Sequence, residues 1–306
     1  MKKSLNTSLF LFLFLYSSFL PAVLSAKSFV QKEILVVRDQ HYIDSLENLL
    51  TNATGTKKIK ILLNLREEYE EINISKSLRY ARQALALAKG LDNKYLFAKC
   101  LYYTGLTYYI QNNFKAGFDY FFKALDIYVE LSDSSNEAVA NRAKEGIGHC
   151  IYLIARSYGI LGNYKKAMSY ALQLLNIDKE MGKKEGELLT LVLIGEIYNA
   201  QKVYKKALDY LLKARKLSIE LGDKYAFAET SYILGDIYYS QDNKEKALEY
   251  WQQCLEYWEE SGANRKIINA LNNIGSIYED WGNYQKAMEY YEKGLAIAKE
   301  VGEKRM

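Results

Sequence analysis

Apolar residues recur at helical intervals through most of the chain, and the stretch 223–262 shows the pattern clearly. Its first half places Phe227, Leu234 and Tyr238 seven and four residues apart, a spacing that puts side chains on one face of an α-helix. A polar interruption at 241–243 ends this series. The second half carries a further series at helical spacing: Ala247, Leu248, Tyr250, Trp251, Cys254, Leu255 and Trp258. Two helices joined by a short turn are therefore predicted.

The same arrangement recurs along the sequence. In each copy a small residue is followed by a Tyr three residues later and by a second Tyr after twelve more. The series is Gly105/Tyr108/Tyr120, Ala155/Tyr158/Tyr170, Gly195/Tyr198/Tyr210, Gly235/Tyr238/Tyr250 and Gly275/Tyr278/Tyr290. From Ala155 onward the step is 40 residues each time. A fixed period of this size indicates one supersecondary unit stacked repeatedly, which is a solenoid.

Local signals mark the ends of the helices. Asn163, Asn243 and Asn283 precede the second helix of their units, where a short side-chain acceptor satisfies free backbone amides. The second helices are expected to stop at glycines that suit a left-handed cap: Gly182, Gly222, Gly262 and Gly302. A glycine inside a helix costs about 1 kcal/mol relative to Ala. Gly235 and its equivalents therefore predict close approach of another helix, with residues such as Ala247 as the matching small surface and the Tyr pairs filling the space between units.

These residues resemble the tetratricopeptide repeat family over roughly 58–302. The common unit of that family has 34 residues. The longer second helix here resembles the repeats of kinesin light chain, of spindle-orientation adaptors and of exported bacterial sensor proteins. The resemblance implies an all-α, right-handed α-solenoid of about six stacked helix-turn-helix repeats, with a concave groove that binds protein or peptide.

The chain divides into three expected regions. Residues 1–26 form a signal peptide or an N-terminal anchor, 27–57 hold a leading helix near 42–50, and 58–306 form the repeat array. The repeats lie near 58–91, 95–132, 137–182, 185–222, 225–262 and 265–302. The step from Gly105 to Ala155 is 50 residues, and the surplus predicts an elongated first helix in the third repeat.

The N-terminus has the composition of an export signal. Lys2 and Lys3 precede the apolar run 9–16, and Ala26 offers a small residue for cleavage. We expect an exported protein, periplasmic or extracellular, whose leader is removed; retention of the leader as a membrane anchor is the alternative. The net charge is +4, and Lys2 and Lys3 account for two of those charges. So small an excess predicts no nucleic-acid partner.

Candidate chemistry is sparse. The three cysteines, Cys100, Cys150 and Cys254, fall at scattered positions and form no disulfide framework, and Cys254 occupies the place of a small core residue. His41 and His149 are far apart and have no neighbouring ligand or triad pattern. We therefore expect a protein that is not an enzyme, with no catalytic residue, no metal and no cofactor.

The resemblance also implies which residues face the groove, because the first helix of each unit lines the concave wall. The expected groove residues are Tyr102, Tyr109, Tyr152, Arg156, Glu196, Asn199, Tyr232, Asp236, Tyr239, Asn272, Asn273 and Ser276. The wall changes from aromatic to acidic and amide-rich along the array. Arg156 is the one cation in this set, so an acidic or carboxylate-ended ligand is disfavoured and a basic or mixed-charge extended segment is the expected partner.

Two function classes remain open. The favoured one is a non-enzymatic exported scaffold that binds a protein or peptide. The alternative is the sensory input region of a signal-transduction protein of histidine kinase, cyclase or transcriptional regulator type. The last helix bears Tyr291, Leu295 and Ile297, which a following helix would cover. Three explanations stay open: self-association through this uncapped repeat, docking of a partner there, or a chain cut short.

Overall fold

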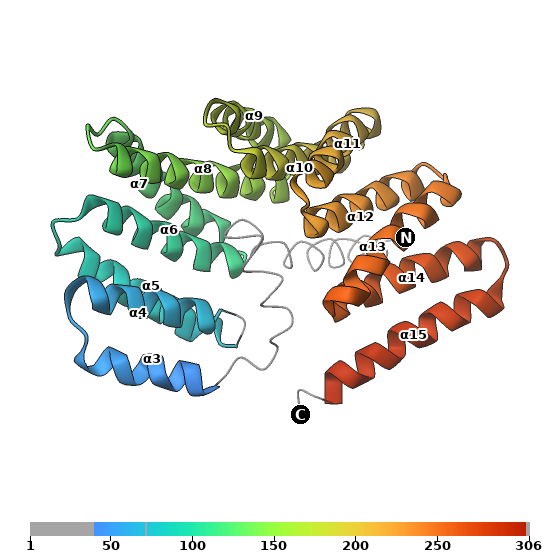
Figure 1. The fold of residues 1–306 in the computed structure, drawn as a ribbon, viewed down its shortest axis with the longest axis horizontal. Coiled ribbons are helices and arrows are strands. Elements are labelled where there is room, and N and C mark those ends of the chain that lie inside the picture. Colours follow the sequence, from blue (N-terminus) through green and yellow to red (C-terminus); the bar gives the residue numbers. More distant parts are fainter. Residues whose placement is uncertain (1–39, 71, 304–306) are drawn as a thin grey trace. The chain divides into compact units, whose positions relative to one another are not determined.

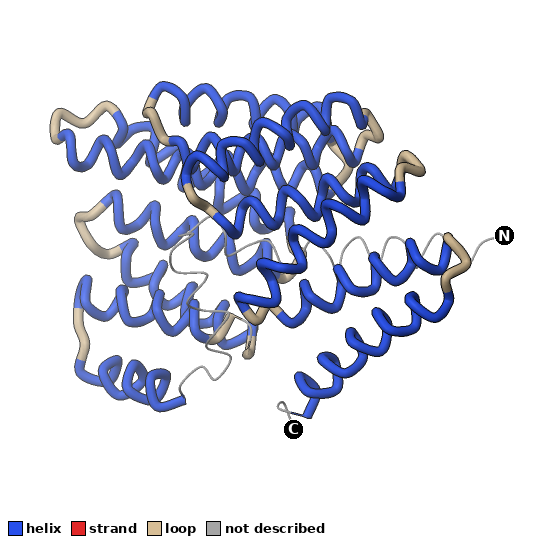
Figure 2. Tube along the Cα trace, turned by 45° about the vertical axis from the view of Figure 1, so that its right-hand side comes forward, coloured by secondary structure: helices blue, strands red, loops and turns tan. Residues whose placement is uncertain are grey.

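The protein is an array of antiparallel helix pairs. The computed structural model describes residues 40–70 and 72–303, and this part of the chain contains thirteen α-helices and no strand (Figure 1 and Figure 2). The expectation of an all-α helical-repeat solenoid is thus confirmed. The described residues divide into two compact units, 40–177 and 178–303, each of which is described by itself. The expected leader, 1–26, lies outside the described residues.

The first unit begins with a helix that covers the end of the array. Its helices are α3 (Gln40–Asn52), α4 (Gly55–Glu68), α5 (Ile74–Lys89), α6 (Lys94–Ile110), α7 (Phe114–Ser132), α8 (Glu137–Ile160) and α9 (Tyr164–Glu180, which continues into the second unit). Ile43 and Leu46 of α3 are buried in a common core with Ile59 and Leu62 of α4. The leading helix predicted near 42–50 is therefore present. The elongated helix is present too, because α8 has 24 residues where α6 has 17.

The second unit contains three consecutive hairpins. Its helices are α10 (Lys184–Ala200), α11 (Tyr204–Leu221), α12 (Lys224–Ser240), α13 (Lys244–Ser261), α14 (Asn264–Asp280) and α15 (Tyr284–Glu303). Trp251 and Trp258 of α13 are each 2% exposed and share a core with Ile267 and Ile274 of α14. The core thus joins the second helix of one hairpin to the first helix of the next.

The mid-helix glycines make room for a large side chain of the partner helix. A Cβ atom placed on Gly235 would lie 2.5 Å from Trp251 Cδ1, and one on Gly195 would lie 2.6 Å from Leu211 Cγ. The predicted close approach is confirmed. The space above each glycine is taken by the bulky residue sixteen positions later, and the small Ala247 is not among the neighbours nearest to Gly235.

The tyrosine pairs stack within each hairpin. Tyr238 and Tyr250 have ring centroids 5.5 Å apart at an interplanar angle of 6°. The four remaining pairs of the series stack with centroids 5.5–5.9 Å apart. Lys246 lies over the Tyr238 ring at 4.9 Å, and three further repeats have the same lysine. The pairs thus join the two helices of one unit. Some also meet the preceding unit as expected, since the Tyr158 ring lies 4.6 Å from Phe118 of α7.

Helix ends follow the predicted caps with one exception. The side chains of Asn163, Asn243 and Asn283 each accept a hydrogen bond from the backbone N–H three residues later. Gly222 and Gly262 end α11 and α13 with φ of 67° and 70°, in the left-handed region. Gly302 was expected to act likewise, but α15 continues through it to Glu303.

The last helix leaves apolar side chains in contact with solvent. Tyr284 is 71% exposed, Met288 62% and Leu295 54%.

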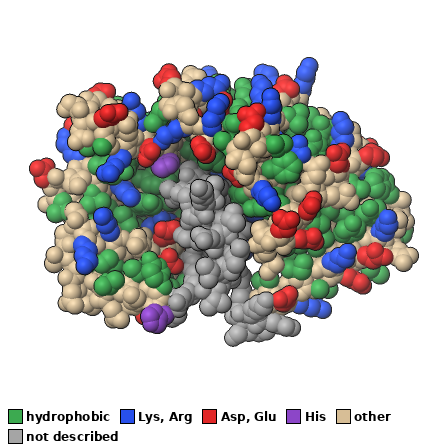
Figure 3. Space-filling model, viewed as in Figure 1, with side chains coloured by type: hydrophobic (Ala, Val, Ile, Leu, Met, Phe, Trp, Pro, Cys, Tyr) green, Lys and Arg blue, Asp and Glu red, His purple; other side chains and the backbone are tan. Residues whose placement is uncertain are grey.

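Acidic and basic side chains are interspersed on the face that Figure 3 draws. Within the described residues, no helix combines the length and apolar character needed to cross a membrane.

Candidate partner-binding surface

The second unit carries a regular polar ladder across two first helices. Tyr225, Tyr232 and Tyr239 are spaced seven residues apart on α12, so they lie two helical turns apart on one face. Each tyrosine hydroxyl is hydrogen-bonded to the α14 residue that lies 41 positions later in the chain: Lys266, Asn273 and Asp280. The term "α12–α14 ladder" refers to these six residues together with Glu229 and Asp236.

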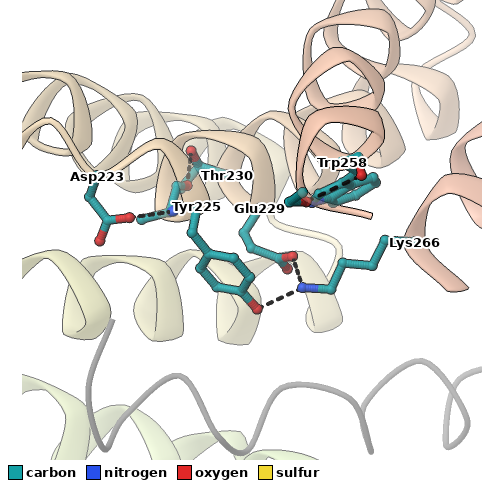
Figure 4. Close-up of polar contacts among 8 residues, drawn as sticks. Asp223, Tyr225, Glu229, Thr230, Trp258 and Lys266 are labelled. Atoms are coloured by element: carbon teal, nitrogen blue, oxygen red, sulfur yellow. Dashed lines mark hydrogen bonds and ion pairs between the residues drawn. The ribbon is translucent and has the colours of Figure 1, made fainter. Parts of the chain in front are cut away.

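The first rung is a buried ion pair. Lys266 Nζ donates to Tyr225 Oη at 2.6 Å and pairs with the Glu229 carboxylate, and both acceptors point toward the ammonium group (Figure 4). The side chains of Lys266 and Glu229 are 11% and 5% exposed. The Lys266 ammonium also lies 4.2 Å from the Tyr225 ring centroid and 5.8 Å from the Trp258 ring. This rung therefore neutralises its own charge and locks α12 to α14.

The middle rung is centred on Asp236. Asn273 Nδ2 donates to Tyr232 Oη at 3.1 Å and lies 3.5 Å from Asp236 Oδ1. Trp251 Nε1 donates to Asp236 Oδ1 at 3.1 Å and to the Tyr232 carbonyl at 3.2 Å. Burial raises the pKa of the Asp236 carboxyl to about 7, against the opposing effect of the Trp251 hydrogen bond. Burial also raises the pKa of the Tyr232 hydroxyl well above its ordinary value.

The third rung lies at the solvent-exposed end of the ladder. Tyr239 Oη donates to Asp280 Oδ2 at 2.9 Å, and Lys244 Nζ is 3.2 Å from the same oxygen. The hydrogen bond from Tyr239, followed by that from Lys244, holds the pKa of Asp280 below its usual value. The Tyr239 ring also packs against Trp251 with centroids 5.5 Å apart. Partly exposed hydroxyl, carboxylate and ammonium groups thus meet at this end.

The structure brings together part of the residue set predicted for the groove. Tyr232, Asp236 and Asn273 contact one another in the middle rung, and Tyr239 lies in the next. Asn272 is exposed, and six members of the set are partly buried: Asn199, Tyr232, Asp236, Tyr239, Asn273 and Ser276. The Ser276 hydroxyl lies 3.2 Å from Tyr291 Oη of α15. Glu196 of α10 is 8% exposed.

The predicted residues of the first unit are buried and engaged in packing. Tyr102 is 4% exposed, and its ring lies 6.1 Å from Phe121 and 5.9 Å from His149. Tyr109 is 6% exposed and packs edge-on against Phe114. Tyr152 and Arg156 are 6% and 2% exposed. The predicted groove residues that solvent can reach therefore lie in the second unit.

Four residues of the ladder were not among the expected groove residues: Tyr225, Glu229, Lys266 and Asp280. Tyr225, Glu229 and Lys266 form its buried first rung. A signal existed, since Tyr225 and Lys266 stand seven residues before Tyr232 and Asn273. Asp280 shows the same spacing, because it stands seven residues after Asn273. A seven-residue step along the first helices would have found all three rungs.

Reactive chemistry has little support in the described part of the chain. Burial raises the pKa of the Cys100 thiol to about 12, and Cys150 and Cys254 are also fully buried free thiols with raised pKa values. Cys254 is thus the small core residue that its position in the repeat predicted. Within the residues that the structure describes, no group of three or more His, Cys, Asp or Glu is placed to hold a metal ion.

Comparison with solved structures shows the same fold in proteins of low sequence similarity. Aspartyl phosphate phosphatase F from Bacillus subtilis is 17% identical, with a TM-score of 0.64 over 89% of this chain and 68% of that protein. The apo form of RapI is 18% identical, with a TM-score of 0.64 over 92% of this chain and 100% of RapI. The Rap conjugation gene regulator of plasmid pLS20, in complex with the Phr* peptide, is 14% identical, with a TM-score of 0.56 over 82% and 78%.

Sequence comparison identifies the repeat type. No curated protein matches this chain. Sequence models described as tetratricopeptide repeat match residues 149–181, 186–250 and 227–300. These ranges include α10 to α14 and hence the whole α12–α14 ladder. The chain therefore carries tetratricopeptide repeats, and the ladder is built from the first helices of two of them.

Proposed function

We propose that this protein is a non-enzymatic scaffold that binds an extended protein or peptide segment along the α12–α14 ladder. The observation that carries the proposal is the ladder itself, three rungs of hydroxyl, amide and charged groups at a constant interval on two rigid helices. Seven residues of helix advance about 10.5 Å. An extended segment covers that distance in about three residues, at about 3.3 Å each. Such a segment can place one polar group against the middle rung and the next against the third, both partly exposed, while the buried first rung holds α12 to α14.

The charge of the ladder favours a basic or mixed-charge partner. The ladder has three carboxylates, and two of them are paired with a lysine: Glu229 with Lys266 and Asp280 with Lys244. Asp236 accepts from the neutral Trp251 indole, so the acidic groups exceed these cations by one. Glu279 on the same end of α14 adds a further carboxylate. The Rap regulator of plasmid pLS20, which shares the fold, was solved with a peptide. That likeness supports a peptide ligand as a class and says nothing of its sequence.

Binding of defined peptide pools tests the proposal. Fluorescent nonapeptide pools rich in Lys and Arg, in Asp and Glu, or in neutral polar residues are titrated against the exported chain by fluorescence anisotropy. We expect the basic pool to bind most tightly and Tyr232→Ala/Asn273→Ala to weaken it at least tenfold. The matched control is Lys216→Ala/Glu220→Ala, an exposed ion pair on α11 that lies outside the ladder. Equal weakening by both double variants, or no preference for the basic pool, contradicts the proposal.

A second copy of the chain is the proposed cover for the exposed face of α15. Forty residues upstream, Leu248 and Leu255 of α13 pack into the core that α13 shares with α14. The equivalent Met288 and Leu295 of α15 are 62% and 54% exposed. Light scattering after size exclusion should show a dimer that Met288→Glu/Leu295→Glu converts to a monomer. A wild-type monomer at all concentrations overturns this part.

Export is proposed from the leader alone, and the sensory-input reading is kept as the alternative function. Mass spectrometry of the mature N-terminus after expression with an intact leader tests cleavage after Ala26. A cytoplasmic, unprocessed chain contradicts export. A kinase, cyclase or regulator encoded next to this chain, and co-purifying with it, would favour the sensory alternative.

A further inference from the structure

Asp236 differs from the other carboxylates of the α12–α14 ladder because no lysine or arginine among the described residues forms an ion pair with it. Glu229 pairs with Lys266, and Asp280 pairs with Lys244. Asp236 receives hydrogen bonds from neutral donors, Trp251 Nε1 at 3.1 Å and Asn273 Nδ2 at 3.5 Å. Both donors use Oδ1, and an ionised carboxylate can accept about four hydrogen bonds. Within the described chain, Asp236 therefore keeps acceptor capacity, chiefly on Oδ2, with no lysine or arginine to use it.

The carboxylate is held in place by rigid neighbours. Trp251 is 2% exposed, and its indole lies directly over Gly235, where an added Cβ would be 2.5 Å away. The indole N–H that bonds Asp236 also bonds the Tyr232 carbonyl, one turn earlier on the same helix. The position of Oδ1 is thus fixed by the packed core, and a ligand does not have to order it.

Aromatic rings flank the carboxylate along α12. Tyr232 lies four residues before Asp236 and Tyr239 three residues after it, so both are on the same helix face. Tyr232 packs against Trp258 and Tyr239 against Trp251, with centroids 5.3 and 5.5 Å apart. Aromatic faces attract cations, and that attraction adds to the charge of a carboxylate. All three residues are partly exposed to solvent.

We propose that Asp236, between Tyr232 and Tyr239, is a subsite for one ammonium or guanidinium group of the bound segment. The subsite rests on the proposed function, because it assigns the ligand chemistry of the middle rung. The ammonium or guanidinium group of the ligand supplies Asp236 with a countercharge, as Lys266 and Lys244 do for the carboxylates of the neighbouring rungs. The raised pKa of Asp236 agrees with a carboxylate that lacks such a countercharge.

Peptide pools with one fixed central residue test the subsite. The pools are N-acetylated and C-amidated nonapeptides whose central residue is lysine, arginine, citrulline, norleucine or glutamate. Anisotropy titrations with the wild-type chain should show the lysine and arginine pools binding at least tenfold more tightly than the citrulline and norleucine pools. Asp236→Asn should remove this preference and leave the norleucine pool within twofold of its wild-type affinity.

The control variant is Glu260→Gln, which removes an exposed carboxylate of α13 that pairs with Lys224 and lies outside the ladder. It should retain the preference for lysine and arginine. If Asp236→Asn retains the preference, or Glu260→Gln loses it, the assignment is overturned. If all pools bind the wild type equally and Tyr232→Ala/Asn273→Ala abolishes binding, the subsite fails and the scaffold function stands. If no pool binds, both fail.

Discussion

Loss of one member of the buried Lys266–Glu229 pair should destabilise the second unit far more than loss of both. In Lys266→Met, the Glu229 carboxylate keeps its buried position, 5% exposed, but loses the ammonium group that compensates it. Lys266 also places its ammonium over the Tyr225 ring and donates to the Tyr225 hydroxyl. Methionine preserves most of the side-chain volume, so the effect of the change is mainly electrostatic.

The expected magnitude follows from the burial of the pair. Breaking a buried ion pair by removing one partner costs about 3–5 kcal/mol, because a buried charge is left without compensation. Replacing both partners with apolar residues of similar volume is often neutral or stabilising. We therefore expect Lys266→Met to lower the free energy of unfolding by about 3 kcal/mol. The double variant Lys266→Met/Glu229→Met should fall within about 1 kcal/mol of the wild type.

Tryptophan fluorescence during urea denaturation measures this effect in the relevant unit. The chain has three tryptophans, at 251, 258 and 281, and all lie in the second compact unit. The matched control is Lys224→Met, which breaks an exposed pair with Glu260 at 3.8 Å and should cost less than about 1 kcal/mol. The reasoning is refuted if Lys266→Met costs no more than this control, or if the double variant is as unstable as the single one.

Four further outcomes are expected. Gly235→Ala should lower the urea midpoint, because the new Cβ would lie 2.5 Å from the Trp251 indole. Overpacking costs about 1–3 kcal/mol and outweighs the helix-propensity gain of about 1 kcal/mol. An unchanged midpoint would mean that the indole moves freely. Affinity for the lysine pool should fall as the pH drops below about 7, because protonation removes the Asp236 charge, whereas Asp236→Asn should show a flat profile. The pKa of Asp236 in the folded protein, about 7, lies above the ordinary value of about 3.9, so folding stability should fall as the pH rises between these two values. Asp236→Asn should therefore stabilise the protein more at neutral than at acidic pH. The buried thiols, Cys100 and Cys254 included, should react with a thiol reagent only after unfolding; rapid reaction of the folded protein would contradict their burial.

The local architecture could be predicted because its determinants act over a few residues. The Asn243 cap and the Gly262 stop each depend on hydrogen bonds within one turn, and both are present. Most of the ten-residue surplus before Ala155 became extra length of α8, which has 24 residues where α6 has 17. Gly302 shows the limit of this reasoning, because the same residue type in the same slot did not end α15.

The candidate site could be predicted only in part. The family pattern selected Tyr232, Asp236 and Asn273, which do meet in the middle rung. It did not select Tyr225 and Lys266, since positions facing a neighbouring repeat depend on the relative rotation and stagger of two helices.

The sequence by itself determined that this chain forms helix hairpins at a step of 40 residues, because hydrophobic period, caps and turns are local properties. Only the tertiary structure decided that α12 and α14 pair at an offset of 41 residues. That offset places Lys266 of α14 beside Glu229 of α12. Among the described residues, the donors that reach Asp236 are the neutral Trp251 and Asn273. Charge pairing across repeats depends on three-dimensional packing, which the order of residues along one repeat does not specify.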